Sequence, residues 1–265
     1  MEGREVLITP EMATELLSRN RNIRSMSKGW VRFFVLLLEL GEFVVTPDGI
    51  CLDGDGDLIN GQHRLQAIVD SGIPARMMLW NNVTDEQMRA MDGGKKRQVS
   101  DSIGADKRVV EIVNPAVRLV FGAPNYPPSY VDKAMASEVG AAAGYLIASC
   151  GTKTKFFSAG WWKLGAVVQM VSGADWKYVG GLYRSLVLAE VEDLPPIGIA
   201  IMRQAFSGMC YAANKSDTLA RSLVVFDPAK QNTTKVQIND ASAYVGVARE
   251  ALAPHFSFIN EARED

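Results

Sequence analysis

The segment Asp57–Ile68, with the sequence DLINGQHRLQAI, has the residue types and spacing best suited to chemistry. A short strand predicted over 58–59 leads through Gly61 directly into a helix predicted from Gln62, where apolar residues recur at helical spacing. Glycine allows close approach to the backbone, and the first N–H groups of a helix carry the positive end of its dipole. With the guanidinium of Arg64 in the first turn, this pattern favours a site for phosphate or another anion.

Neighbouring residues extend this hypothesis. Ala67 lies on the same side of the predicted helix as Arg64 and is small where a bulky residue would block a ligand. His63 could donate a hydrogen bond to a phosphate, shuttle a proton or have no role in the site. The structural alternative is a buried helix start in which Arg64 pairs with a carboxylate, and the spacing leaves both interpretations open.

The residue counts exclude several other kinds of site. With 28 Lys and Arg against 30 Asp and Glu, the net charge of −2 excludes binding of nucleic acid by bulk positive charge. Two histidines exclude a histidine-rich metal site or a His-based triad. The acidic loop 53–57 resembles a calcium loop, but Leu58 and Arg64 replace its required Gly and Glu, so we predict a solvated turn. Cys51, Cys150 and Cys210 lack a CxxC pair and are typical of reduced thiols in a cytosolic protein.

Basic residues nevertheless gather locally. The stretch between Glu15 and Glu39 contains no acid and holds the following basic residues: Arg19, Arg21, Arg24, Lys28 and Arg32. A second cluster follows a Gly-Gly step and consists of Lys95, Lys96 and Arg97. If both flank the Gly61 turn, they form a basic rim for nucleotide phosphates or a DNA backbone. A solvated helix face and a loop explain them equally well.

The elements that position these residues divide the chain in two. Residues 1–108 alternate strand-like and helix-like segments and predict an α/β domain with a small mixed sheet. The predicted strands cover 6–8, 43–46, 50–52, 58–59 and 75–80, and the predicted helices begin near Pro10, Ser27, Gln62 and Thr84. Residues 109–265 are rich in alanine, glycine and long apolar stretches and predict a mainly α-helical domain, and the sequence shows no internal repeat of fixed period.

The most apolar run in the chain is 33–38, and it is flanked by Arg32 and Glu39. It falls far short of the roughly 20 residues that span a bilayer, so no membrane partner is expected. A helix over 30–40 would be apolar nearly all round, which is typical of a helix buried in a core. Aromatic pairs at 156–157 and 161–162 are likewise expected to pack in a core or a subunit interface rather than stack on bases.

Three stretches in order resemble a known family. Gly61, Arg64 and Ala67 are similar to the G-x-x-R-x-x-A box of the ParB/sulfiredoxin superfamily, and residues 60–64 are closer still to the D-G-Q-H-R variant of ParB-like proteins from phages and prophages. Upstream, residues 20–27 resemble the family's N-x-x-N-R-x-L-S stretch. Downstream, residues 91–97 resemble its D-x-G-K-x-R run. The resemblance covers about residues 5–105.

The resemblance implies a ParB/sulfiredoxin-like fold and nucleotide phosphates at Gly61, Gln62, His63 and Arg64, with Ala67 on the same helix side. Arg24 takes the place of the first box's arginine and is expected to reach the same phosphates. Gln62 stands where sulfiredoxins have their cysteine, which excludes that reaction. Asn60 replaces an aspartate of the kinase-like motif and cannot serve as a carboxylate base.

The implied cofactor is a nucleotide, ATP or CTP, together with Mg²⁺, for which Asp57 and Asp92 are the candidate ligands. Glu11 or Glu15 could fill the place of the kinases' catalytic glutamate, and His63 or Asn60 could assist. We therefore predict a phage-type NTPase or phosphotransferase that acts on or beside DNA in the host cytoplasm. The alternatives are a non-catalytic DNA-binding or regulatory module and a nuclease, with a homo-oligomer formed through the helical domain.

Overall fold

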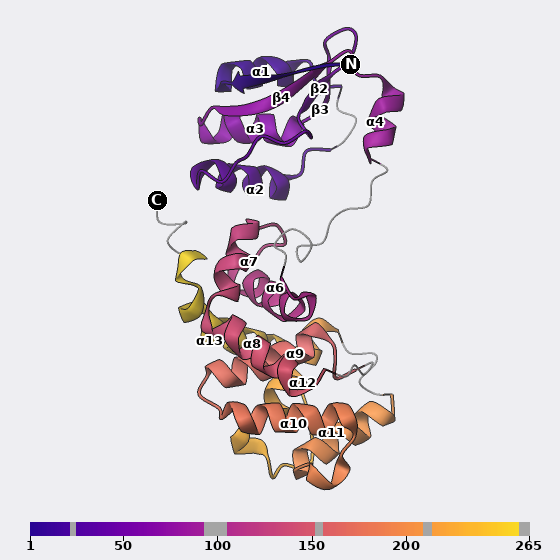
Figure 1. Ribbon diagram of the computed structural model, residues 1–265, viewed down its shortest axis with the longest axis vertical. Helices are drawn as coiled ribbons and strands as arrows, with labels where there is room; N and C mark the ends of the chain where they lie inside the picture. Colours follow the sequence, from indigo (N-terminus) through magenta and orange to yellow (C-terminus); the bar gives the residue numbers. More distant parts are fainter. Residues whose placement is uncertain (22–24, 93–104, 152–155, 209–213, 260–265) are drawn as a thin grey trace. The chain divides into compact units, whose positions relative to one another are not determined.

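The computed structural model describes residues 1–21, 25–92, 105–151, 156–208 and 214–259, and it folds as two compact units (Figure 1). The first comprises residues 1–97 and 123–127, and the second comprises residues 98–122 and 128–265. The first is an α/β unit with a four-stranded sheet, and the described part of the second contains helices without strands. The predicted order, an α/β region followed by a mainly helical one, is confirmed.

The sheet of the α/β unit is mixed, with strand order β1-β4-β2-β3. Its strands are β1 (Glu2–Ile8), β2 (Ile50–Leu52), β3 (Leu58–Asn60) and β4 (Ala75–Asn81). β4 pairs antiparallel with β1 and parallel with β2, while β2 and β3 form an antiparallel pair. The predicted strand over 43–46 is wrong, because the amide of Phe43 bonds to the carbonyl of Leu37 and the chain continues as an irregular, largely exposed segment.

Helices of the α/β unit pack side by side, with α3 (Gln62–Ser71) between α1 (Pro10–Ser18) and α2 (Lys28–Glu39) (Figure 1). α4 (Asp85–Asp92) follows β4 along the chain. Thr9 caps α1 by accepting the amide of Met12, as the Thr-Pro-Glu start predicts. The core between helices and sheet is aliphatic and includes Ile8, Ile50, Leu58, Leu65, Ile68 and Met77.

The expectation that α2 is buried all round is wrong. Only Val31 and Leu38 of this helix are buried, whereas Trp30 remains 43% exposed. The reason is geometric: a helix that packs on one neighbour through one side cannot hide a full circle of apolar residues. No helix in the described ranges is long and apolar enough to cross a membrane.

The described part of the helical unit is built from short helices. They are α6 (Lys107–Phe121), α7 (Pro128–Met135), α8 (Glu138–Ser149), α9 (Gly160–Val171), α10 (Trp176–Leu188), η1 (Val191–Asp193), α11 (Pro196–Phe206), α12 (Lys215–Val225), η2 (Pro228–Lys230), α13 (Ala241–Leu252) and η3 (Ala253–Phe256). Residues 223–225 end α12, and residues 235–238 pair with no strand in the described chain.

The centre of the helical unit is a close contact between α9 and α12. The Oγ of Ser222 donates a 2.5 Å hydrogen bond to the carbonyl of Trp162, and a Cβ on Gly165 would lie 2.4 Å from that Oγ. Phe156, Phe157 and Trp162 are buried and pack ring against ring. The prediction that the aromatic pairs serve packing is confirmed for these three side chains, whereas Trp161 is only partly buried.

Candidate phosphate-binding turn

The turn between β3 and α3 is shaped by a glycine that no other residue could replace without strain. Gly61 has a φ of +102°, in the left-handed region, and caps α3. A Cβ there would lie 2.5 Å from Cδ1 of Ile50 and 3.2 Å from its Cα. The Oδ1 of Asn60 accepts the amide of Gly61 at 2.9 Å, which fixes the entry into the helix. The predicted strand–glycine–helix turn is therefore confirmed.

Residues 19–21 and 25–27 lie along this turn, so the described parts of the first two sequence boxes are neighbours in space. Asn20 forms a parallel bridge with Leu58. The Nδ2 of Asn20 donates to Oε1 of Gln62 at 2.9 Å, and the amide of Ser27 donates to Nε2 of His63 at 2.9 Å. Gln62 is 8% exposed and its amide group holds this stretch against the start of α3. Arg24 lies outside the described residues.

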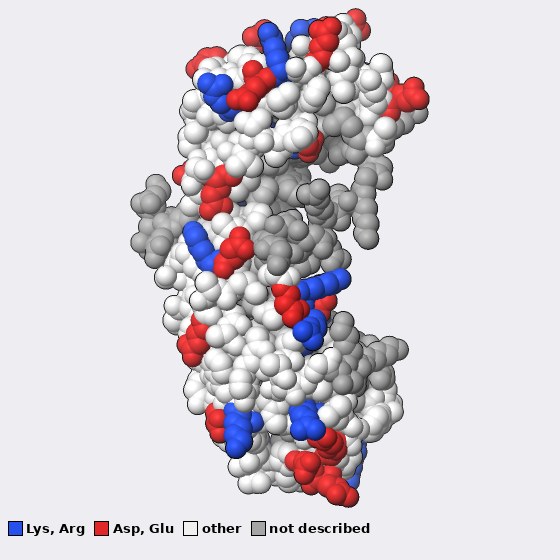
Figure 2. Space-filling view, in the orientation of Figure 1, with Lys and Arg blue, Asp and Glu red and all other residues white. Residues whose placement is uncertain are grey.

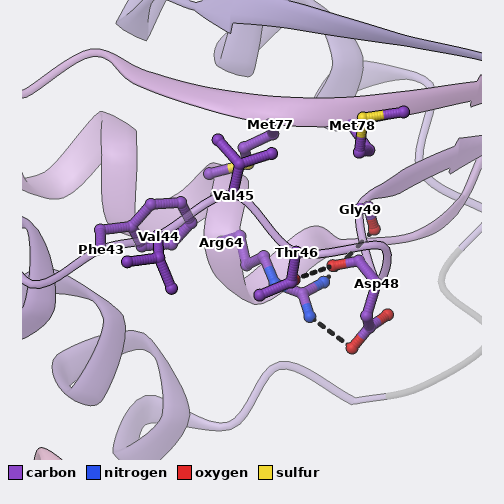
Figure 3. A pocket seen from close by; sticks show the side chains of 9 residues that line it. All are labelled: Phe43, Val44, Val45, Thr46, Asp48, Gly49, Arg64, Met77 and Met78. Carbon is purple, nitrogen blue, oxygen red and sulfur yellow. Dashed lines mark hydrogen bonds and ion pairs between the residues drawn. The ribbon is translucent and has the colours of Figure 1, made fainter.

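Arg64 points towards the loop before β2 (Figure 3). Its Nη2 donates to Oδ2 of Asp48 at 2.6 Å, and its Nη1 donates to the carbonyl of Gly49 at 3.3 Å. The guanidinium carbon lies 5.4 Å from the ring centre of Phe34. The side chain of Arg64 is 15% exposed, whereas that of Asp48 is 62% exposed. Arg64 thus has a structural carboxylate partner, as the alternative interpretation of the turn predicted.

The cavity beside Arg64 is small. The cavity that its side chain lines, together with Phe43 to Thr46, Asp48, Gly49, Met77 and Met78, has a volume of about 10 Å³. This is about the room that one water molecule needs, so a nucleotide cannot enter it as it stands. A phosphate could reach Arg64 only from the exposed side, where the carboxylate of Asp48 now lies.

Asp48 is the residue of this site that sequence reasoning missed. It lies within Pro47-Asp48-Gly49, a sequence typical of a turn, and the turn returns the chain to β2. Its Oδ1 also accepts a long, 3.5 Å hydrogen bond from Nδ2 of Asn60. The turn was readable from the sequence, but its contact with a residue 16 positions later was not.

The acidic loop 53–57 forms the turn that was predicted, and its carboxylates form ion pairs with basic residues. The Oδ1 of Asp53 accepts the amides of Asp55 and Asp57, and these backbone hydrogen bonds, with help from Arg21, lower the pKa of Asp53. Arg21 pairs with Asp53 at 3.2 Å and with Asp85 at 3.5 Å, and Arg19 pairs with Asp57 at 3.3 Å. On the face seen in Figure 2, acidic and basic side chains of the α/β unit accordingly lie intermixed.

The remaining predicted site residues lie in several places. Ala67 is fully buried in the core of the α/β unit, and Glu11 is exposed in the first turn of α1, where the hydroxyl of Thr9 lowers the pKa of its carboxyl. Asp57 pairs with Arg19, and across the described ranges no group of three or more acidic, histidine or cysteine side chains could hold a metal ion. The backbone of Asp92 ends α4, while Lys95, Lys96 and Arg97 lie outside the described residues.

Comparison with known proteins adds no relative. A scan of family models found no match to the chain, and neither did searches of curated proteins and of solved structures.

Proposed function

We propose that the α/β unit binds phosphate groups of a nucleotide at the β3–α3 turn, as a ParB-like NTPase or phosphotransferase acting on or beside DNA. One observation carries this proposal. The stretches 20–27 and 60–67 resemble two boxes of the ParB/sulfiredoxin superfamily and are far apart in sequence. The Asn20–Gln62 and Ser27–His63 hydrogen bonds nevertheless bring both ends of the first stretch to the start of α3.

The hydrogen-bond donors and positive charge at this turn suit an anion. The N-terminus of α3 contributes the positive end of a helix dipole, and Arg64 contributes a guanidinium that packing on Phe34 holds in place. Without a ligand, the carboxylate of Asp48 balances the positive charge of Arg64. A phosphate carries more charge than a carboxylate, and Asp48 is exposed enough to turn away, so ligand binding would exchange one anion for the other.

Catalysis would then rest on positioning and charge stabilisation, as is general for phosphoryl transfer. Arg64 would hold the phosphates, with Asn60 beside the turn. His63 is a poorer candidate for a base while its Nε2 accepts the Ser27 amide. The described carboxylates do not fit a metal cage, so no step is assigned to Mg²⁺.

Thermal unfolding of the full chain tests this proposal, with ATP, CTP, GTP, dNTPs or short DNA duplexes, each with and without Mg²⁺. A nucleotide at about 100 times its Kd should stabilise the protein by about 2.7 kcal/mol. Arg64→Gln should abolish this shift. The matched control is Arg76→Gln, because Arg76 lies in the same unit but is 65% exposed and, among the described residues, pairs only with Glu5 at 3.4 Å.

The outcomes separate the candidate functions. Nucleotide shifts that Arg64→Gln abolishes, together with phosphate release, support the enzyme. A shift with DNA alone that weakens steeply as salt rises indicates the non-catalytic DNA-binding module instead. Cleavage of supercoiled DNA without nucleotide indicates the nuclease.

A further inference from the structure

The helical unit contains a pocket that the proposed function does not use. It has a volume of about 320 Å³ and is lined by Gln204 of α11, Arg221 of α12 and the extended residues Val236, Gln237, Ile238 and Asn239. Small-ligand pockets begin at about 300 Å³, so it is large enough for a molecule of modest size.

A chain of hydrogen bonds holds Arg221 rigidly at this pocket. Its Nε donates to Oδ2 of Asp217 at 2.7 Å, and its Nη1 donates to Oε1 of Gln204 at 2.8 Å. Gln204 in turn donates through Nε2 to the carbonyl of Val236 at 2.9 Å, which ties the extended segment to α11. The side chain of Arg221 is only 18% exposed. A guanidinium fixed in this way loses little entropy when it binds a further group.

The groups that remain available are donors. Within the described chain, Nη2 of Arg221 and the side-chain amides of Gln237 and Asn239 have no hydrogen-bond partner, and Arg221 is the only charged residue that lines the pocket. Asp217 balances the charge from the Nε side and does not line the pocket. Val236, which is 2% exposed, and Ile238 supply an apolar wall.

We propose that this pocket binds a small organic carboxylate. Its oxygens would accept from Nη2 of Arg221 and from the amide side chains, and its carbon skeleton would lie against Val236 and Ile238. A guanidinium with neighbouring amide donors matches a planar carboxylate, because two parallel hydrogen bonds can form at once. The same chemistry is offered by a free carboxylic acid and by the C-terminus of a peptide, and this site is independent of the β3–α3 turn.

Titration calorimetry on the full chain tests the proposal with benzoate and with its neutral analogue benzamide. Benzoate should bind and benzamide should not. Arg221→Gln should weaken benzoate binding by at least about tenfold, the loss expected for a charge-assisted hydrogen bond. Arg203→Gln is the control, since Arg203 is exposed on the same α11. An acetylated tripeptide with a free C-terminus, compared with its amide, separates the peptide source from the free acid.

Because Arg221 also joins α12 to α11 through its hydrogen bond to Gln204, its variant could fail to fold. The double variant Gln237→Ala/Asn239→Ala removes only exposed side chains and should weaken benzoate binding without lowering Tm. Equal binding of benzoate and benzamide, benzoate affinity unchanged in a folded Arg221→Gln protein, unchanged affinity in the double variant, or absence of binding by every carboxylate would each overturn the proposal.

Discussion

The backbone amide of Ser27 donates a 2.9 Å hydrogen bond to Nε2 of His63, across 36 positions of sequence. Nε2 of His63 is therefore the acceptor in this contact and is not available as a donor. Ser27 precedes α2, and His63 lies in the first turn of α3. The bond therefore joins the starts of two helices.

We expect His63→Ala to loosen this junction. Loss of the acceptor leaves the Ser27 amide without its partner and should cost about 1 kcal/mol, which corresponds to about fivefold faster amide exchange at Ser27. Hydrogen exchange followed by NMR measures the rate. Gln66→Ala is the control on the same helix, because Gln66 bonds only to Asp70 among the described residues. Unchanged exchange at Ser27 would contradict the assigned role of His63.

Gly61→Ala should be the more damaging change. The positive φ costs about 1–2 kcal/mol, and the crowding against Ile50 adds about 1–3 kcal/mol because the nearest atoms include backbone. Urea unfolding measures the sum. Two controls separate the terms: Gly41 has a φ of +65° with nothing within 4 Å, and Gly54 has open space without a positive φ. Gly41→Ala should therefore lose only the stability that the positive φ costs, and Gly54→Ala should lose neither contribution.

The sequence predicts the β3–Gly61–α3 turn well because glycine and the 3.6-residue period are local signals. It predicts the type of partner for Arg64, a carboxylate, as one of two alternatives. It cannot name Asp48, because that contact depends on how the loop after α2 returns to the sheet.

The same reason explains the errors. Phe43 to Thr46 has β-branched and aromatic residues typical of a strand, but the amide of Phe43 bonds to the carbonyl of Leu37 in α2 instead. The acid-free stretch 16–38 looks like a basic patch when read along the chain. In space, Arg19 and Arg21 meet the acidic loop 53–57, whose carboxylates come from 32 or more positions later.

Cys51 should resist alkylation in the folded protein. It is fully buried in β2, and burial, with the nearby charge of Asp48, raises the pKa of its thiol. Since the thiolate is the nucleophile, iodoacetamide at neutral pH should leave Cys51 unmodified until urea unfolds the chain. Peptide mapping by mass spectrometry reads this site separately from Cys150 and Cys210. Equal labelling before and after unfolding would contradict the burial of Cys51.

Asp53 should make folding stability depend on pH in the acid range. Hydrogen bonds from the backbone amides of Asp57 and Asp55, and then Arg21, lower the pKa of Asp53 in the folded state. A lowered pKa stabilises the fold above the unfolded-state pKa, and this contribution is lost as pH falls through the folded-state pKa. Asp53→Asn should therefore be less stable than the natural chain at neutral pH, and the difference in urea midpoint should shrink on acidification. A difference independent of pH would contradict this account.

The ion pair between Asp48 and Arg64 gives the sharpest test of the proposed phosphate site. If the carboxylate stands in for a phosphate, Asp48→Asn frees the guanidinium and should tighten binding of ATP or CTP by about fivefold, a modest gain because the pair is partly solvated. Stability should fall by no more than about 1 kcal/mol. The comparison is Asp55→Asn, which makes the same change of charge in the exposed acidic loop of the same unit.

Calorimetry at fixed ionic strength measures the affinities of both variants. A gain in Asp48→Asn alone means that the carboxylate and the phosphate compete for Arg64, since a general change of charge would act on both variants alike. Equal affinities, or weaker binding in Asp48→Asn, would show that the anion does not replace Asp48. Combining Asp48→Asn with Arg64→Gln should cancel the gain, because the freed guanidinium is then missing, and this coupling distinguishes a local exchange of partners from two independent effects.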